Sequence, residues 1–494
     1  MGLIQRDALR TMVLSYTGLL LGYLNKGVLF IILLTPSEIG LINLIVMVGY
    51  LFAQVASLGS VNTVLKFFHF FRNKERSNYG FLKLILAVSV IGIAVTAALV
   101  FLLQPWISEF YMQRSPEFVD YYYWIIPVGV ANLLFIVFET YLKGLFKNIL
   151  PVFVNEILLR LLQTALIVLY AVDSISFHQF LIFNFLVYFI PILILIVYLV
   201  QLGEIQSLRA KIDIPKRFRK ILVSYGLYSY LNSIGTVAVI TLDTTMIAAM
   251  IGLSGTGVYS IVIFLTSALM VPYKSLNRIS APFIPVYWKE RKMLEMDRLY
   301  KDVSGIGLIM GCVMFSLVWL NRVELFSLLK DPAYLEGIWV FFFLMIGRLA
   351  DMYTGVNSVI LLTSKKYRID IVFTLVLIFL VFGLNYWLIP IYGITGAAIS
   401  TMFALIAYNF LRVWYVWKSY RIHPFKINHV WVFAIFVASV LLIEWIPAFS
   451  DNFYVNVSWH TAAFGILFVL PVIALKLEPQ VNDYLIKIRK RFIK

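Results

Sequence analysis

Five basic residues interrupt stretches of sequence that are otherwise apolar: Lys26, Arg160, Lys274, Arg278 and Arg348. Lys274 and Arg278 are four residues apart, so one face of a helix would carry both, with Asn277 beside them. A guanidinium can donate hydrogen bonds to two oxygens of a phosphate, and a lysine ammonium adds a second positive charge. This spacing predicts an anion-binding face. The alternative is that both side chains only reach out of the apolar region to its polar edge.

Two further pairs of opposite charge have helical spacing. Arg348 and Asp351 are three residues apart, and they can pair on one helix. Arg348 is a candidate for the same anion site, and Asp351 is a candidate for ion coupling; a structural ion pair is the alternative. Glu156 and Arg160 are four residues apart, and for them we favour a structural pair.

A possible gate follows from two turns that resemble each other. If Gly40 is aligned with Gly257, Lys26 falls opposite Asp243. We expect these two charges to pair and to close an outer gate, with Asn25 in the cavity wall next to Lys26. Two unrelated buried charges are the alternative.

A polar and aromatic stripe ends at Asp243. Its members are Tyr225, Tyr228, Asn232, Thr236 and Asp243, at helical spacing. Such a stripe predicts a hydrated wall for sugars, with Tyr225, Tyr228 and Asn232 as wall residues. The alternative is that these side chains hold neighbouring helices together.

The composition places all these residues in a membrane. Of 494 residues, 62% are hydrophobic and 13% are charged, and the mean hydropathy is +0.90. Soluble domains are about 45–50% apolar and about 25% charged, so a soluble fold and a disordered chain are both excluded. The net charge of +16 lies in short loops, which favours a membrane rather than nucleic acid. The single cysteine, Cys312, excludes a disulfide within one chain.

Fourteen apolar stretches are long enough to cross a membrane as helices. They are residues 10–34, 41–66, 81–103, 122–143, 152–171, 179–201, 221–250, 257–282, 303–321, 338–363, 369–389, 393–417, 430–447 and 460–476. Alternate loops hold 33 of the 41 basic residues, while the other loops hold only Arg114, Arg322 and Lys330. The positive-inside rule therefore predicts that both termini are cytoplasmic.

The spans divide into two similar halves. We predict an all-α membrane protein with two pseudo-symmetric six-helix lobes, related by an axis along the membrane normal, and two extra helices. The predicted parts are an N-lobe (1–201), a basic linker (202–220), a C-lobe (221–417), spans 13 and 14 (430–476) and a basic tail (477–494).

Sequence motifs for enzyme chemistry are absent. There is no Gly-Lys dipeptide for a phosphate-binding loop, no Gly-x-Ser-x-Gly, no Asp-x-Asp and no His-Glu-x-x-His. The expected outer loops are too short for a catalytic domain. The sequence therefore predicts a transport protein without cofactor or metal, rather than an enzyme.

Four segments resemble the polysaccharide-biosynthesis (oligosaccharide) flippases, whose superfamily includes multidrug exporters of the MATE type and the lipid II flippase. Residues 34–41 look like the family's Pro-x-x-x-Gly turn, and residues 57–62 like its Leu-Gly element. Residues 255–260 look like the matching turn in the second lobe, and residues 390–398 like the Tyr-Gly-x-x-Gly-Ala-Ala segment before span 12.

The resemblance implies a flippase of the bacterial inner membrane for an oligosaccharide linked to undecaprenyl pyrophosphate. Lys274 and Arg278 would bind the pyrophosphate on the cytoplasmic side, and Lys26 would receive it nearer the outer side. Expected partners are this glycolipid, membrane lipids and a polysaccharide polymerase or its assembly machinery, but no nucleic acid. Coupling to H⁺, Na⁺ or the membrane potential would involve Asp243 or Asp351.

Three alternatives stay open. A MATE-type multidrug exporter would share the fold but favour acidic cavity residues. A lipid II flippase is disfavoured, because Lys26 stands where related lipid II flippases tend to use arginines. A membrane glycosyltransferase or polymerase would need catalytic carboxylates or a large outer loop.

Overall fold

The computed structural model describes residues 3–73, 77–210, 212, 216–329, 331–446 and 452–480, and within these ranges all regular structure is helical. Thirteen helices are long and apolar enough to cross a membrane. A further pair, Leu253–Leu269 and Val271–Glu290, passes the same test together and is bent by 45°. The chain is a multi-pass membrane protein, and the predicted all-α class with about fourteen spans is confirmed.

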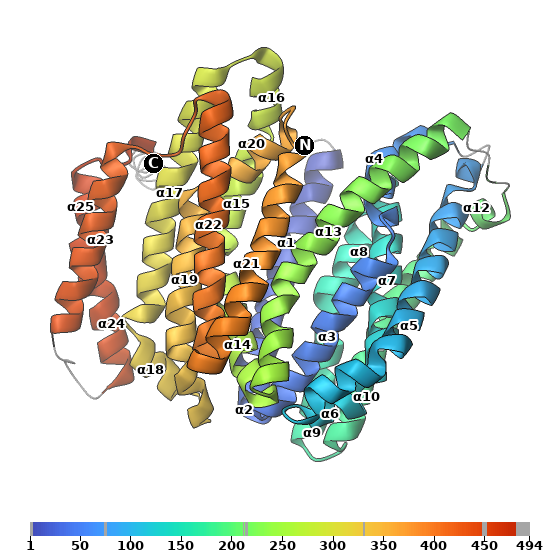
Figure 1. Ribbon diagram of the computed structural model, residues 1–494, viewed down its shortest axis with the longest axis horizontal. Helices are drawn as coiled ribbons and strands as arrows, with labels where there is room; N and C mark the ends of the chain where they lie inside the picture. The colour runs from blue at the N-terminus through green and yellow to red at the C-terminus, as the bar shows by residue number, and fades with distance from the viewer. Residues whose placement is uncertain are drawn as a thin grey trace. The chain divides into compact units, whose positions relative to one another are not determined.

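The chain forms two compact units, and the first extends through Ile261. It runs from blue to green in Figure 1. Its longer helices are α1 (Leu3–Leu24), α3 (Pro36–Ala56), α4 (Ser60–Phe71), α5 (Phe81–Met112), α7 (Ile125–Gly144), α9 (Leu159–Ala171), α10 (Phe177–Leu186), α11 (Phe189–Gln201), α13 (Lys216–Met250) and the beginning of α14 (Leu253–Leu269). Shorter elements between them are η1 (Asn25–Leu29), α2 (Phe30–Leu33), η2 (Ser77–Gly80), α6 (Pro116–Asp120), η3 (Tyr122–Trp124), α8 (Ile149–Phe153), η4 (Val154–Leu158) and α12 (Gln206–Arg209).

The second unit begins at Val262. Its elements are the rest of α14, α15 (Val271–Ser280), α16 (Phe283–Glu290), α17 (Met293–Trp319), α18 (Arg322–Ser327), η5 (Pro332–Glu336), α19 (Gly337–Tyr353), α20 (Asn357–Thr363), α21 (Ile369–Tyr392), α22 (Ile394–Tyr420), α23 (Ile427–Trp445), α24 (Phe453–Phe464), η6 (Gly465–Val469) and α25 (Leu470–Ala474). The boundary between the two units falls inside α14, and α13 packs against α3 and α4 of the first unit. The predicted division into two lobes with a linker at 202–220 stays a prediction.

Several spans are interrupted, and sequence explains the interruptions. The second span breaks between α3 and α4, where Gly59 has a φ of +78°. A Cβ on Gly59 would lie 2.3 Å from the carbonyl oxygen of Gly226 on α13, so only glycine allows this close approach. The eighth span bends between α14 and α15, and Pro272 stands in the first turn of α15, a position where proline is well tolerated.

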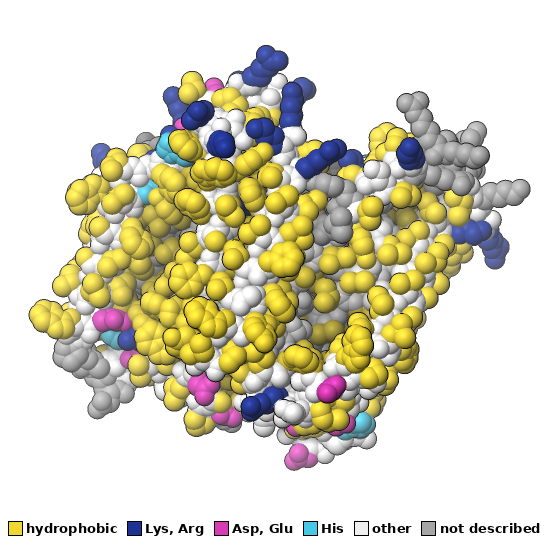
Figure 2. Space-filling view, viewed as in Figure 1, with side chains coloured by type: hydrophobic (Ala, Val, Ile, Leu, Met, Phe, Trp, Pro, Cys, Tyr) yellow, Lys and Arg dark blue, Asp and Glu magenta, His cyan; other side chains and the backbone are white. Residues whose placement is uncertain are grey.

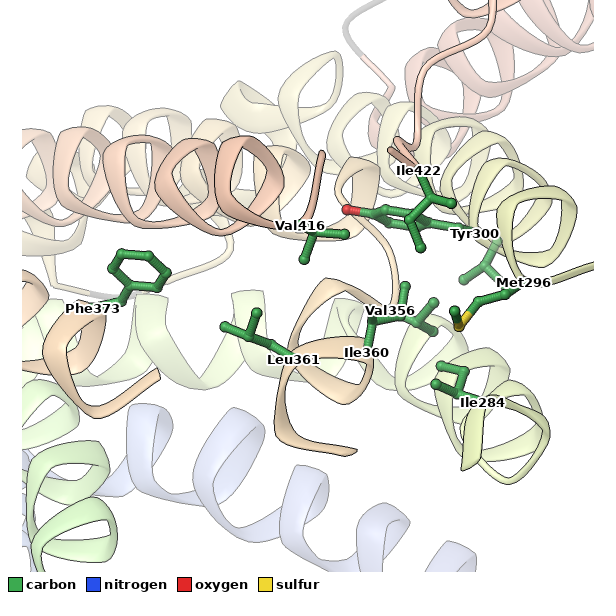
Figure 3. Packing of buried hydrophobic residues seen from close by; sticks show 10 residues of the cluster. Ile284, Met296, Tyr300, Val356, Ile360, Leu361, Phe373, Val416 and Ile422 are labelled. Atoms are coloured by element: carbon green, nitrogen blue, oxygen red, sulfur yellow. The ribbon is translucent and has the colours of Figure 1, made fainter. Parts of the chain in front are cut away.

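A buried apolar cluster stabilises one end of the second unit. Figure 3 shows Ile284 of α16 and Met296 and Tyr300 of α17 close to Ile360 of α20 and Val416 of α22. This packing joins α16, α17, α20 and α22.

Basic side chains gather at one end of each unit. In Figure 2, Lys and Arg lie where Figure 1 places α16 and α20 in the second unit, and near α12 in the first, while hydrophobic side chains cover the helices between. We call this end of each unit its basic end.

Candidate functional site

The second unit brings several predicted site residues together around α15 and the last turn of α19. The hydroxyl of Tyr273 donates to the carbonyl oxygens of Asp351 and Gly355, both at 3.0 Å. Gly355 has a φ of +62° and separates α19 from α20, and a Cβ there would lie 2.6 Å from Oγ of Ser304. Tyr273 therefore ties α15 to the break after α19, next to Lys274.

Lys274 and Arg278 project from α15 with exposed side chains. Lys274 lies within electrostatic range of Arg348 and Asp351 on α19. In the part of the chain that the structure describes, neither side chain has a hydrogen-bond or ion-pair partner. The structure thus brings Lys274, Arg348 and Asp351 together. Among the described residues, the side chains of Lys274 and Arg278 are free to bind a ligand.

The expected ion pair between Arg348 and Asp351 is not formed among the described residues. Oδ1 of Asp351 instead accepts a hydrogen bond from Nδ2 of Asn409 on α22, at 3.3 Å. Oδ1 of Asn409 accepts from Oγ1 of Thr354 at 2.9 Å and from Nδ2 of Asn357 at 3.1 Å. Asn409 is not among the predicted site residues; the signal in the sequence that points to it is an amide side chain inside an apolar span.

Several buried polar atoms around this site lack partners within the described ranges, and Oγ of Ser304 is one of them. Two others are Nε of Arg348, a donor, and Oδ1 of Asn277, an acceptor. A buried polar group without a hydrogen bond is costly, so such groups in a native structure call for a ligand, water or a functional explanation. A ligand with an anionic oxygen and a hydroxyl would satisfy both. No cluster of three or more His, Cys, Asp or Glu that could hold a metal ion occurs in the residues searched, which are those described.

In the first unit, Lys26 and Asp243 have different partners and do not pair. Nζ of Lys26 donates to Oδ1 of Asn43 at 3.2 Å, and Asn43 itself donates to the carbonyl of Ile39 at 3.0 Å. Asp243 is buried and accepts a hydrogen bond from the hydroxyl of Tyr259 at 2.6 Å. The expected Lys26–Asp243 gate pair is therefore not formed in this structure, where Lys26 donates to Asn43 and Asp243 accepts from Tyr259.

Asn25 joins helices rather than lining a cavity. It is 2% exposed, its Nδ2 donates to the carbonyl of Arg160 at 2.8 Å, and its Oδ1 accepts from Thr164 at 2.7 Å. Arg160 pairs with Glu156 at 2.7 Å, as predicted, and also donates to the carbonyl of Gly18. Asn25 belongs to the π-helical turn η1 and Glu156 to the π-helical turn η4, and such turns are frequent at functional sites.

Tyr225 lies in an aromatic cluster near the basic end of the first unit. Its ring is covered by Nζ of Lys66 at 3.8 Å and contacts Phe67 edge to face at 5.3 Å. This environment explains Tyr225 as packing and cation–π contact rather than as a sugar-binding wall. Tyr228 and Asn232 lie on α13, and their side chains fall outside the described part of the chain.

Comparison of the sequence with known proteins gives distant relatives. No family model matches the chain. An uncharacterized membrane protein of Methanocaldococcus jannaschii, MJ1068, is 22% identical over 420 residues, which are 80% of this chain and 81% of that protein. The capsular polysaccharide biosynthesis protein CapF of Staphylococcus aureus is 29% identical over 163 residues, 31% of this chain and 41% of CapF.

The similarity in fold to solved structures extends over more of the chain than the similarity in sequence. The lipid II flippase MurJ, in an inward closed conformation, matches with a TM-score of 0.70 at 13% identity, over 94% of this chain and 99% of MurJ. An inward-facing multidrug resistance transporter of the MATE family matches with a TM-score of 0.60 at 13% identity, over 87% of this chain and 96% of the transporter. The chain therefore has the fold that MurJ and MATE transporters share, as the sequence resemblance implies.

Proposed function

We propose that this protein flips a lipid-linked oligosaccharide, carried on undecaprenyl pyrophosphate, across a bacterial inner membrane for the synthesis of a cell-surface polysaccharide. The observation that carries the proposal is the cationic site of the second unit. Lys274, Arg278 and Arg348 stand within spans, and no carboxylate pairs with any of them in the described part of the chain.

The cost of charge in a membrane argues that these cations have an anionic ligand. An Arg or Lys at the centre of a span costs at least about 2.5–3.5 kcal/mol, so it normally faces water, a partner or a substrate. A pyrophosphate offers several anionic oxygens to Lys274, Arg278 and Nε of Arg348. Sugar hydroxyls next to it can donate to Oδ1 of Asn277.

The direction of transport follows from the charge of the loops. The positive-inside rule places the basic ends and both termini in the cytoplasm. Lys274 and Arg278 would then take the pyrophosphate from the cytoplasmic leaflet, and Lys26 would receive it nearer the outer side. Alternating access by rocking of the lobes needs no ATP; H⁺, Na⁺ or the membrane potential would drive it through Asp243 or Asp351, and a polymerase would take the product.

Two kinds of protein with a similar fold suggest other substrates, namely cationic drugs and lipid II. A MATE-type exporter of cationic drugs should place carboxylates in its cavity, whereas the site described here has three basic side chains, Lys274, Arg278 and Arg348, and one carboxylate, Asp351. The comparison with CapF, a capsular polysaccharide biosynthesis protein, favours a polysaccharide precursor over lipid II.

The test is the orientation of lipid-linked glycan in cells that make either the wild type or Lys274→Gln/Arg278→Gln. The double variant should reduce export at least about tenfold, because hydrogen bonds to charged groups contribute about 1.5–3 kcal/mol each. Complete glycan should then accumulate on the cytoplasmic face. Lys147→Gln, at an exposed lysine of the first unit, is the matched control. Normal glycan export by a correctly inserted double variant would overturn the proposal and favour the drug exporter.

A further inference from the structure

We propose that Asp351 is a resident counter-charge that limits how tightly Lys274 and Arg348 hold a bound anion. This inference rests on the proposed function. In the empty site the carboxylate balances the two cations. In the loaded site it repels the anion, and so it speeds release.

The placement of Asp351 supports this role. It follows Arg348 by one turn of α19, and its backbone carbonyl accepts the hydroxyl of Tyr273, the residue before Lys274. Lys274 lies within electrostatic range of both Arg348 and Asp351. Yet Asp351 forms an ion pair with neither cation among the described residues, so the guanidinium and the ammonium stay available to a ligand.

Asn409 explains why the carboxylate stays apart from the cations. Its Nδ2 donates to Oδ1 of Asp351 at 3.3 Å and to the carbonyl of Leu405 at 3.1 Å. Its Oδ1 accepts from Thr354 and Asn357. Because the donor and the acceptor of this amide each have two partners, rotation of the amide would break several hydrogen bonds at once. Asn409 therefore holds the carboxylate where it acts on the cations through space only.

The electrostatics give the direction of the effect. Charges that are near each other interact through space without direct contact, and a negative charge repels a bound anion. A site with uncompensated cations would bind a pyrophosphate tightly and release it slowly. A transporter needs a site that the cargo can leave, and one fixed carboxylate lowers the affinity without occupying the site.

The experiment measures binding of inorganic pyrophosphate to the purified full-length protein in nanodiscs, together with glycan flipping in vesicles. Asp351→Asn should bind pyrophosphate at least about tenfold more tightly, since the repulsion is removed, and should flip glycan more slowly. Asp351→Glu keeps the charge and should bind like the wild type. Structural damage would weaken binding, so the sign of the change separates the two causes.

Two further variants sharpen the test. Asn409→Leu should free Asp351 to pair with Arg348, and it should weaken pyrophosphate binding. Asp297→Asn removes a carboxylate of the same unit that pairs with Lys301 at 2.6 Å, and it should leave the affinity unchanged. If the wild type binds no pyrophosphate, the proposed function fails. If the wild type binds but folded Asp351→Asn binds equally or more weakly, only the present inference fails.

Discussion

Gly40 and Gly257 pack backbone against backbone at the first turns of α3 and α14, and the contact is reciprocal. A Cβ on Gly40 would lie 2.0 Å from the carbonyl oxygen of Leu253, and a Cβ on Gly257 would lie 1.8 Å from that of Pro36. Each contacted residue stands four positions before the opposite glycine. The two turns that the sequence aligns as repeats thus meet each other in the fold, and only glycine allows this approach.

Substitution of either glycine should destabilise the protein. In Gly40→Ala or Gly257→Ala, the added methyl group must push the two helices apart, and overpacking of this kind costs about 1–3 kcal/mol. We expect a lower Tm in a thermal melt of the purified protein. Gly383→Ala is the control, since no atom lies within 4 Å of a Cβ there; alanine should preserve or raise the Tm. Equal melting of all three variants would contradict the close contact.

Arg412 and Asp370 form a buried ion pair in the second unit. Nε and Nη2 of Arg412 donate to Oδ1 of Asp370 at 2.9 and 2.6 Å, and the two side chains are 10% and 4% exposed. Asp370→Ala should cost about 3–5 kcal/mol, because it leaves a buried guanidinium unpaired. The double variant Asp370→Leu/Arg412→Met should recover most of the lost Tm. A double variant no more stable than the single one would show that the pair itself stabilises this region.

We predict that the protein loses stability at high pH because of Lys426, which lies in the loop before α23. Burial lowers the pKa of Lys426, but hydrogen bonds to Asp302 and Glu478, both at 2.8 Å, outweigh it and raise the pKa above 10.5. A lysine whose pKa is raised on folding stabilises the protein fully below its unfolded pKa of about 10.4. That stabilisation disappears as the pH rises through the folded pKa.

The measurement is the Tm of the wild type and of Lys426→Met between pH 7 and 11. We expect a constant difference up to about pH 10, the region below the unfolded pKa, and a shrinking difference above it. Lys147→Met, which removes an exposed lysine, should show no such trend. A Tm difference that grows with pH would contradict the assignment.

Asn25 and Lys26 are neighbours with separable roles. Asn25→Ala removes the hydrogen bonds to the carbonyl of Arg160 and to Thr164, while Oγ1 of Thr164 keeps its bond to that carbonyl. The loss costs about 0.5–1.5 kcal/mol per hydrogen bond. It should lower the Tm while the remaining folded protein still flips glycan. Lys26→Gln can keep the bond to Asn43, and it should slow flipping with little change in Tm. Parallel melts and flipping assays compare the two, and the opposite result would assign the cavity role to Asn25.

The sequence by itself determined the class of the fold. Apolar stretches of about 20 residues are long enough to cross a membrane as helices, and the charges of the loops predict the orientation of these helices. Local spacing was also sufficient to predict the ion pair between Glu156 and Arg160, because residues four apart on a helix lie on one face. The correspondence of Gly40 and Gly257 was also visible in the sequence, since each glycine closes a short segment of similar composition that the structure places at the beginning of a helix.

Tertiary structure decided which partner each isolated charge has. Lys26 contacts Asn43 rather than Asp243, and Asn409, which is 58 residues from Asp351, holds that carboxylate. Helical periodicity fixes which residues share a face of one helix, but it does not fix which helices pack together or how far each slides along its neighbour. A polar group in a span bonds to whatever that packing places within about 3 Å, and the packing depends on the whole chain.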